Sequence, residues 1–145
     1  METGRQKLLQ DLIQKLTGVF QSTHKDHCFS FDGLALRRQE MMILFFINKK
    51  NGQASVKEIA KFLNVTSGAI TQFTDGLVEK KLVQRESDAL DRRLVNIKLA
   101  PKVKHDFGDF KKKFIESFNE LFSNLSDEEI LQLTVLLAKV NNQKP

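Results

Sequence analysis

The chain of 145 residues has the length of one ordinary domain, and 23 basic against 18 acidic residues give it a net charge of +5. Apolar residues make up 41% and charged residues 28%, a globular mixture that excludes wholesale disorder. The single cysteine excludes a disulfide framework. The start of the chain lacks the apolar stretch of a signal peptide, and the longest apolar run, 41–47, is too short to cross a bilayer. We therefore expect a cytoplasmic protein that does not contact a membrane.

Helical periodicity dominates the chain, because apolar residues recur at spacings of three and four in most segments. The predicted helices cover residues 5–21, 36–48, 55–63, 66–81, 101–125 and the segment from 126 onward. Capping-box sequences at Ser55 and Ser126 start two of them, and Thr66 is predicted to cap a third. The segment 24–33 has no clear periodicity and is predicted to be irregular.

Two short strands, 82–86 and 94–99, are predicted on either side of a polar tip, 87–93. A helix, a turn, a second helix and then a two-stranded hairpin make a winged helix-turn-helix. The predicted fold class is therefore mainly α with a small β-hairpin wing, with further helices before and after it.

The helix predicted over 66–81 has a small, neutral outer face at its N-terminal end. A helical wheel places Ile70, Phe73 and Leu77 on the inner side. The outer side holds Ser67, Gly68, Thr71 and Gln72, then Asp75 and Glu79 nearer the C-terminal end, with Thr74 on its flank. Small residues permit close approach to a major groove, and Gln can pair with adenine. A solvated amphipathic helix is the alternative interpretation.

The hairpin tip carries Arg92 and Arg93 beside Asp91. Arginine suits the narrow, negative minor groove of DNA, and a neighbouring carboxylate can orient its guanidinium. An ordinary surface ion pair is the alternative. Because the tip follows a helix of the recognition type, DNA binding is favoured.

The segment 55–99 resembles the multiple-antibiotic-resistance regulator (MarR) family of winged-helix repressors. The resemblance rests on 63–72 for the turn and recognition helix, 77–83 for the helix end and first strand, and Asp91-x-Arg93 followed by Leu99 for the wing. It implies a homodimer of a single domain. In that domain, residues 1–33 and 101–145 supply the dimerisation helices, and residues 36–100 form the winged helix-turn-helix core.

The resemblance also implies how double-stranded DNA is bound. The expected major-groove readers at a palindromic operator are Ser67, Gly68, Thr71 and Gln72. In the wing, Arg93 is expected in the minor groove, with Asp91 orienting it. The expected backbone contacts are Arg92, Lys57, Lys61 and Thr66. The chain is expected to act as a repressor that is released by a small aromatic or other ligand, or by a redox signal.

Three positions depart from the family pattern. Lys81 stands where glycine is usual, so the recognition helix is expected to end without a left-handed cap. Ala100 replaces a capping threonine before Pro101, and no basic residue accompanies Gln72.

For the remaining candidate sites, a structural interpretation is favoured over a functional one. His24, His27 and Cys28 are a weak zinc pattern, and Cys28 is a candidate redox thiol, but a polar loop and an inert cysteine are the favoured interpretations. The Phe stripe over 107–122 is interpreted as a dimer interface in preference to an effector pocket. The sequence contains no catalytic motif, so we expect no enzyme and no cofactor. The alternative function is a winged-helix module that binds a protein partner and no DNA.

Overall fold

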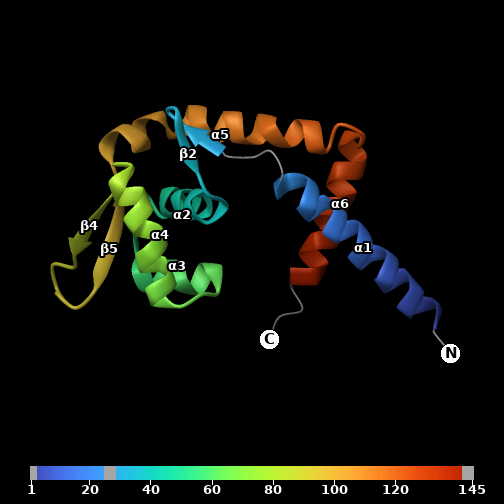
Figure 1. Cartoon of the computed structure of the whole chain (residues 1–145), viewed down its shortest axis with the longest axis horizontal. Helices are drawn as coiled ribbons and strands as arrows, with labels where there is room; N and C mark the ends of the chain where they lie inside the picture. Colours follow the sequence, from blue (N-terminus) through green and yellow to red (C-terminus); the bar gives the residue numbers. More distant parts are fainter. Residues whose placement is uncertain (1–2, 25–28, 142–145) are drawn as a thin grey trace.

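The computed structural model describes residues 3–24 and 29–141, and this part of the chain is mostly helical (Figure 1). In chain order the elements are α1 (Gly4–His24), β1 (Phe29–Phe31), β2 (Leu34–Leu36), α2 (Arg38–Lys49), β3 (Gln53–Ser55), α3 (Val56–Leu63), α4 (Ser67–Glu79), β4 (Val83–Ser87), β5 (Val95–Leu99), α5 (Pro101–Leu121) and α6 (Asp127–Asn141). The predicted fold class, a winged helix-turn-helix with flanking helices, is confirmed.

A short hairpin, β1–β2, occupies part of the segment that the sequence predicted to be irregular. Asp32 and Gly33 form its turn with φ values of 50° and 78°, the left-handed pair that is typical of tight hairpins. The hairpin buries Phe31 and Leu36 against the core. The predicted start of the second helix was therefore wrong, because Leu36 ends β2 and α2 begins at Arg38.

Local hydrogen bonds fix both helices of the helix-turn-helix. The Ser55 hydroxyl accepts from the Glu58 N–H at 3.0 Å, and the Glu58 carboxylate accepts from the Ser55 N–H at 2.8 Å, which confirms the predicted capping box. Asn64 ends α3 in the left-handed conformation, with a φ of 55°. The Thr66 hydroxyl then accepts from the Ala69 N–H at 3.2 Å and caps α4 as predicted.

The wing belongs to a three-stranded antiparallel sheet with the order β3-β5-β4, not to a two-stranded hairpin as predicted. Asn51 and Gly52, with φ values of 60° and 92°, turn the chain from α2 into β3. β3 contains only three residues, which is too short for an alternating pattern to be visible in the sequence.

The chain leaves the end of α4 through a left-handed residue, Lys81, although that residue is not a glycine. Lys81 has a φ of 59°, and the next N–H, that of Leu82, donates to the Leu77 carbonyl at 3.0 Å. The expectation of an end without a left-handed cap was wrong. A left-handed non-glycine residue costs about 1–2 kcal/mol, and burial of a leucine such as Leu82 contributes a similar amount in the opposite direction.

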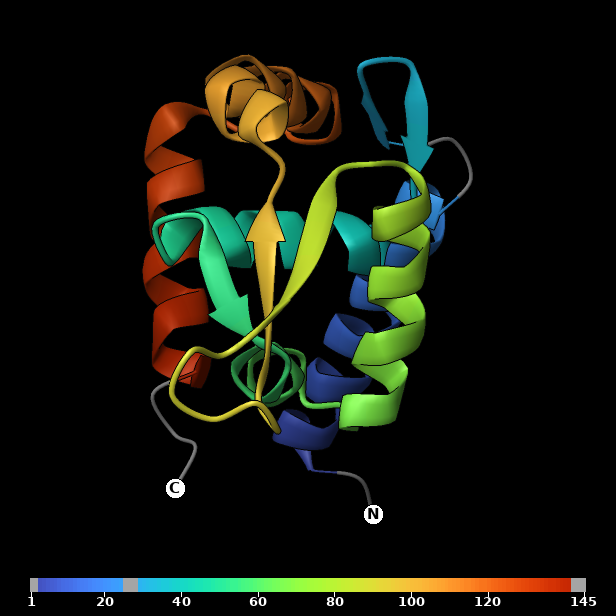
Figure 2. The ribbon, with the colours of Figure 1, turned by 90° about the vertical axis from the view of Figure 1, so that its left-hand side faces the viewer.

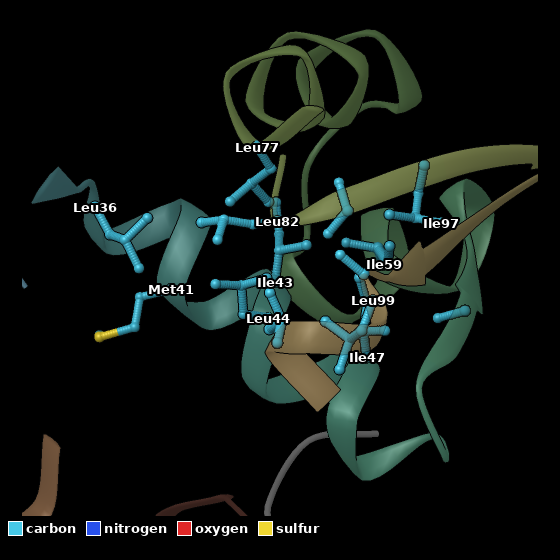
Figure 3. Close-up of a cluster of buried hydrophobic side chains, with 14 of the residues drawn as sticks. Leu36, Met41, Ile43, Leu44, Ile47, Ile59, Leu77, Leu82, Ile97 and Leu99 are labelled. Atoms are coloured by element: carbon cyan, nitrogen blue, oxygen red, sulfur yellow. The ribbon is translucent and has the colours of Figure 1, made fainter. Parts of the chain in front are cut away.

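The core of the winged part is formed by α2, α3, α4 and the sheet (Figure 3). Its most deeply buried side chains include Ile43, Leu44, Ile47, Ile59, Ile70, Leu77, Ile97 and Leu99. Ile70 and Leu77 hold the inner side of α4 in this core, as the helical wheel predicted. The outer side of α4 consequently faces away from the protein.

Helix α5 crosses from the wing to the terminal helices (Figure 1) and ends at Leu121, short of the predicted end at Leu125. Phe110 packs edge-on against Phe31, and Phe107 packs against Phe45, with ring centroids 5.0 and 5.3 Å apart. The first half of the Phe stripe is therefore part of the core of one chain. The prediction that the whole stripe forms a dimer interface was wrong for this half.

Candidate nucleic-acid interface

The start of α4 and the tip of the wing lie on the same side of the molecule (Figures 1 and 2). Figure 2 shows α3, seen end-on, between the two. The four predicted readers on α4 are all exposed: Ser67, Gly68, Thr71 and Gln72. A Cβ on Gly68 would meet only the Thr66 hydroxyl, at 3.9 Å, so packing within this chain does not require a glycine there. The absent side chain leaves the outer face of the helix open.

The residues predicted to contact the DNA backbone are also exposed. Lys57 and Lys61 lie one turn apart on α3, and Thr66 precedes α4. The Thr66 hydroxyl is already engaged by the Ala69 N–H. The free N–H groups of the first turn of α4 point out of its N-terminal end, where a helix favours an anion.

At the wing, Arg93 is held by Asp91. The Arg93 Nε and Nη2 atoms donate to the two carboxylate oxygens of Asp91 at 3.1 and 3.3 Å, and the Arg93 N–H donates to the same group at 3.0 Å. The hydrogen bond from the Arg93 side chain is the main reason that the pKa of Asp91 lies below its ordinary value. The Arg93 side chain is nonetheless 90% exposed, so the pair orients the guanidinium without covering it. Arg92, its neighbour, is also exposed.

Asp88 gives the wing tip its shape, a role that the sequence did not reveal. Its carboxylate accepts from the N–H groups of Leu90 and Asp91 at 2.8 and 3.2 Å and from the Asn96 side chain at 3.2 Å. These backbone hydrogen bonds hold the pKa of Asp88 below its usual range. The signal for this turn is an aspartate two and three residues before the amides that it accepts from.

One residue of α4, Thr74, differs from the helical-wheel prediction, and Asp75 lies where the wheel placed it but has an unexpected partner. Thr74, expected on the flank of the outer face, is fully buried, and its hydroxyl donates to the Thr71 carbonyl at 3.0 Å. Asp75 does lie outside, but it forms an ion pair with Arg85 of β4. Arg85 also donates to the Thr71 carbonyl and the Thr74 hydroxyl. Sequence reasoning missed Arg85, and the only sign of it was an acid on a face predicted to meet DNA.

The predicted metal pattern lies mostly outside the described residues. His27 and Cys28 fall in the segment that is not described, and His24 is the last residue of α1. Among the residues that the structure does describe, no group of three or more histidine, cysteine or acidic side chains could hold a metal ion. Within the same residues, no helix is long and apolar enough to span a membrane.

A helix-turn-helix with an exposed second helix and an arginine-bearing wing defines the class of winged-helix DNA-binding proteins. A MarR family model matches residues 36–94. The HTH-type transcriptional repressor YetL of Bacillus subtilis is 30% identical over 121 residues, which cover 83% of this chain and 69% of YetL. The chain belongs to the MarR family of transcriptional regulators.

Two further comparisons cover almost the whole chain. The HTH-type transcriptional regulator YpoP of Bacillus subtilis is 29% identical over 140 residues, which are 97% of this chain and 98% of YpoP. A mutant of MarR from E. coli, solved in complex with operator DNA, has a TM-score of 0.73 at 24% identity and covers 96% of this chain and 99% of its own. The flanking helices therefore belong to the shared fold together with the winged part.

Proposed function

We propose that this chain is a cytoplasmic repressor that binds a palindromic operator as a homodimer. The observation that carries the proposal is that the start of α4 and the tip of the wing lie on the same side of the molecule (Figure 2). The wing tip carries the exposed side chain of Arg93. That arrangement fits a helix in a major groove and a wing in the neighbouring minor groove. The operator-bound structure of the E. coli relative supports this binding mode.

The proposed roles follow from what each side chain offers. Gln72 reads an adenine, while Ser67, Gly68 and Thr71 allow the helix to approach the bases closely. Arg93 enters the minor groove, and Asp91 orients it through the hydrogen bonds described above. The proposed backbone contacts are Lys57, Lys61, Thr66 and Arg92. Because the reading face of α4 lacks a cation, these backbone contacts and the wing supply most of the salt-dependent affinity.

The terminal helices supply the proposed dimer interface, because their apolar faces are uncovered in one chain. On α1 the exposed apolar residues are Leu8, Leu9, Leu12, Ile13, Leu16 and Val19. On α6 they are Ile130, Leu131, Val135, Leu136, Leu137 and Val140. An apolar surface of this extent is unusual on a monomer and is typical of a subunit interface. We assign residues 1–33 and 101–145 to dimerisation and 36–100 to DNA binding.

We further propose that a small aromatic or other ligand, or a redox signal, releases the repressor. A ligand that binds better to a dimer with mismatched recognition helices would shift the population away from the DNA-binding form. The two helices must lie about 34 Å apart, one turn of DNA, to fit successive major grooves.

The test begins with selection of bound duplexes from a random pool, which we expect to recover a palindrome. Fluorescence anisotropy on that duplex then compares Arg93→Ala with Gln72→Ala. Removing Arg93 should weaken binding at least tenfold and lower the salt slope by about one. Removing Gln72 should relax the preference at one base pair and cost about 1–3 kcal/mol.

Lys111→Ala is the matched control for charge, because Lys111 is exposed on α5. Figure 1 shows α5 at the end of the molecule opposite the start of α4 and the tip of the wing. This variant should bind the operator like the wild type. If no duplex is enriched, and the protein instead captures a protein partner in a salt-insensitive way, the DNA-binding proposal is wrong and the interaction-module alternative is favoured.

A further inference from the structure

We infer that Arg85 is a positioning residue for DNA recognition, because it fixes the reading turn of α4 against the wing strand β4. The inference rests on the proposed function, since it concerns how the two DNA-contacting parts are held in register. Arg85 is not among the residues proposed to touch DNA, and it acts through Thr71, Thr74 and Asp75.

The hydrogen bonds of Arg85 converge on one turn of α4. Its Nη2 group shares two hydrogens among three acceptors, the Thr71 carbonyl at 3.0 Å, the Thr74 hydroxyl at 2.8 Å and the Asp75 carboxylate at 2.5 Å. The Thr71 carbonyl belongs to the turn that carries the proposed readers Thr71 and Gln72. Thr74 is fully buried, so the guanidinium reaches inward from β4 to the side of the helix.

The position of these bonds along α4 explains why they matter. The chain joins α4 to β4 through residues 80–82, at the end of the helix opposite the readers (Figure 2). Thr71 lies eight residues before the end of α4 at Glu79, which is about 12 Å along the axis. A tilt of about 10° at the connection would move the reading turn by roughly 2 Å, more than a recognition site tolerates. The bonds from Arg85 resist that tilt close to the readers.

An alternative role for Arg85 is direct contact with a DNA phosphate. Substitution of Asp75 distinguishes this role from the positioning role. Asp75 is an exposed acid on the helix that approaches DNA, with 56% of its side chain accessible. If charge alone decided affinity, removal of this acid would strengthen binding to a polyanion. If Asp75 holds Arg85 in place, its removal weakens binding. The two roles therefore predict effects of opposite sign.

The experiment measures the affinity of Asp75→Ala, Arg85→Met and the double variant for the selected operator and for a random duplex. We expect each single variant to bind the operator about tenfold more weakly and to lose less on the random duplex. The double variant should bind about as weakly as the worse single variant, because both changes break one network. Glu79→Ala is the matched control, since it removes another exposed acid from the same helix and should bind no more weakly than the wild type.

Circular dichroism and thermal unfolding verify that each variant is folded. Operator binding by folded Asp75→Ala that equals or exceeds that of the wild type overturns the inference. An equal loss on operator and random duplex also overturns it, because it would indicate a phosphate contact or a general structural role. If the wild type binds no duplex at all, the proposed function fails first and the inference falls with it, so the two failures are distinguishable.

Discussion

The carboxylate of Asp91 shows how a single residue prepares the wing for DNA. Arg93 is 90% exposed, and an exposed side chain of that length samples many rotamers unless a neighbour restrains it. Two side-chain hydrogen bonds to Asp91 restrict the guanidinium before any DNA arrives. Preorganisation of this kind reduces the ordering cost of binding.

The same pair predicts a pH dependence. Because hydrogen bonds from Arg93 lower the pKa of Asp91, the pair is intact at neutral pH and is lost only as the pH falls through that lowered pKa, below the ordinary range of aspartate. In Arg93→Ala, the Asp91 pKa should rise toward its ordinary value, as measured by carbon-13 NMR of the side-chain carboxyl. Arg92→Ala is the control and should leave the Asp91 pKa unchanged. An Asp91 pKa that stays the same in Arg93→Ala would contradict the pairing.

Single residues also mark the limit of what the sequence could predict about the site. The wheel correctly placed Ile70 and Leu77 inside and the four readers outside, because direction on a helix follows from spacing alone. It misjudged Thr74, which is fully buried and whose hydroxyl accepts a hydrogen bond from Arg85, a residue on another element. Partners across elements depend on tertiary packing, which spacing does not encode. The roles of the readers at DNA remain predictions.

At the scale of elements, capping residues allowed the starts of three helices to be predicted from the sequence. The strands β1, β2 and β3 were missed because they are short. Ser55, Thr66 and Ser126 all accept hydrogen bonds from the first turn that follows them, as their sequences predicted. The signals of such caps lie within four residues. β1, β2 and β3 have three residues each, and their partners, not their own patterns, make them strands.

The packing of α2 against α4 depends on a buried acid that a glycine accommodates. Glu40 of α2 is fully buried, and its carboxylate accepts from the Arg37 N–H at 2.8 Å and from Lys80, at the end of α4, at 2.7 Å. A Cβ on Gly76 would lie 2.5 Å from the other carboxylate oxygen. The absent side chain at Gly76 therefore lets the two helices share this ion pair.

We predict that Gly76→Ala destabilises the protein by about 1–2 kcal/mol. Alanine favours a helix by about 0.5–1 kcal/mol over glycine, but displacement of an anchored, buried carboxylate costs more. Gly108→Ala is the matched control, because a Cβ there meets nothing within 4 Å and the variant should be slightly more stable. Urea unfolding at equal protein concentrations measures both free energies. If both alanine variants stabilise the protein equally, Glu40 moves aside without a loss of free energy, and the prediction is wrong.

For the whole molecule, the distribution of buried surface separates two regions. The winged part has its own core, whereas none of the described residues of α6 is buried. α5 joins the two regions, and its buried aromatic rings, Phe107 and Phe110, lie in its first half. The apolar faces of α1 and α6 are therefore exposed in a single chain. In the proposed dimer, a second copy buries them.

We predict that the protein sediments at about twice its chain mass of 16.6 kDa, and that Leu12→Glu combined with Leu136→Glu shifts it to the monomer. The two leucines are 51% and 57% exposed on α1 and α6, and an unpaired carboxylate in an apolar interface is strongly unfavourable. Leu90→Glu is the control for charge, because Leu90 is 99% exposed at the wing tip and should leave the dimer intact. The monomeric variant should also lose most of its affinity for a palindrome while keeping that for a half-site, because the second recognition helix is no longer tethered to the first. A wild type that sediments as a monomer, or a double variant that remains a dimer, would contradict this interface, and sedimentation velocity distinguishes these outcomes directly.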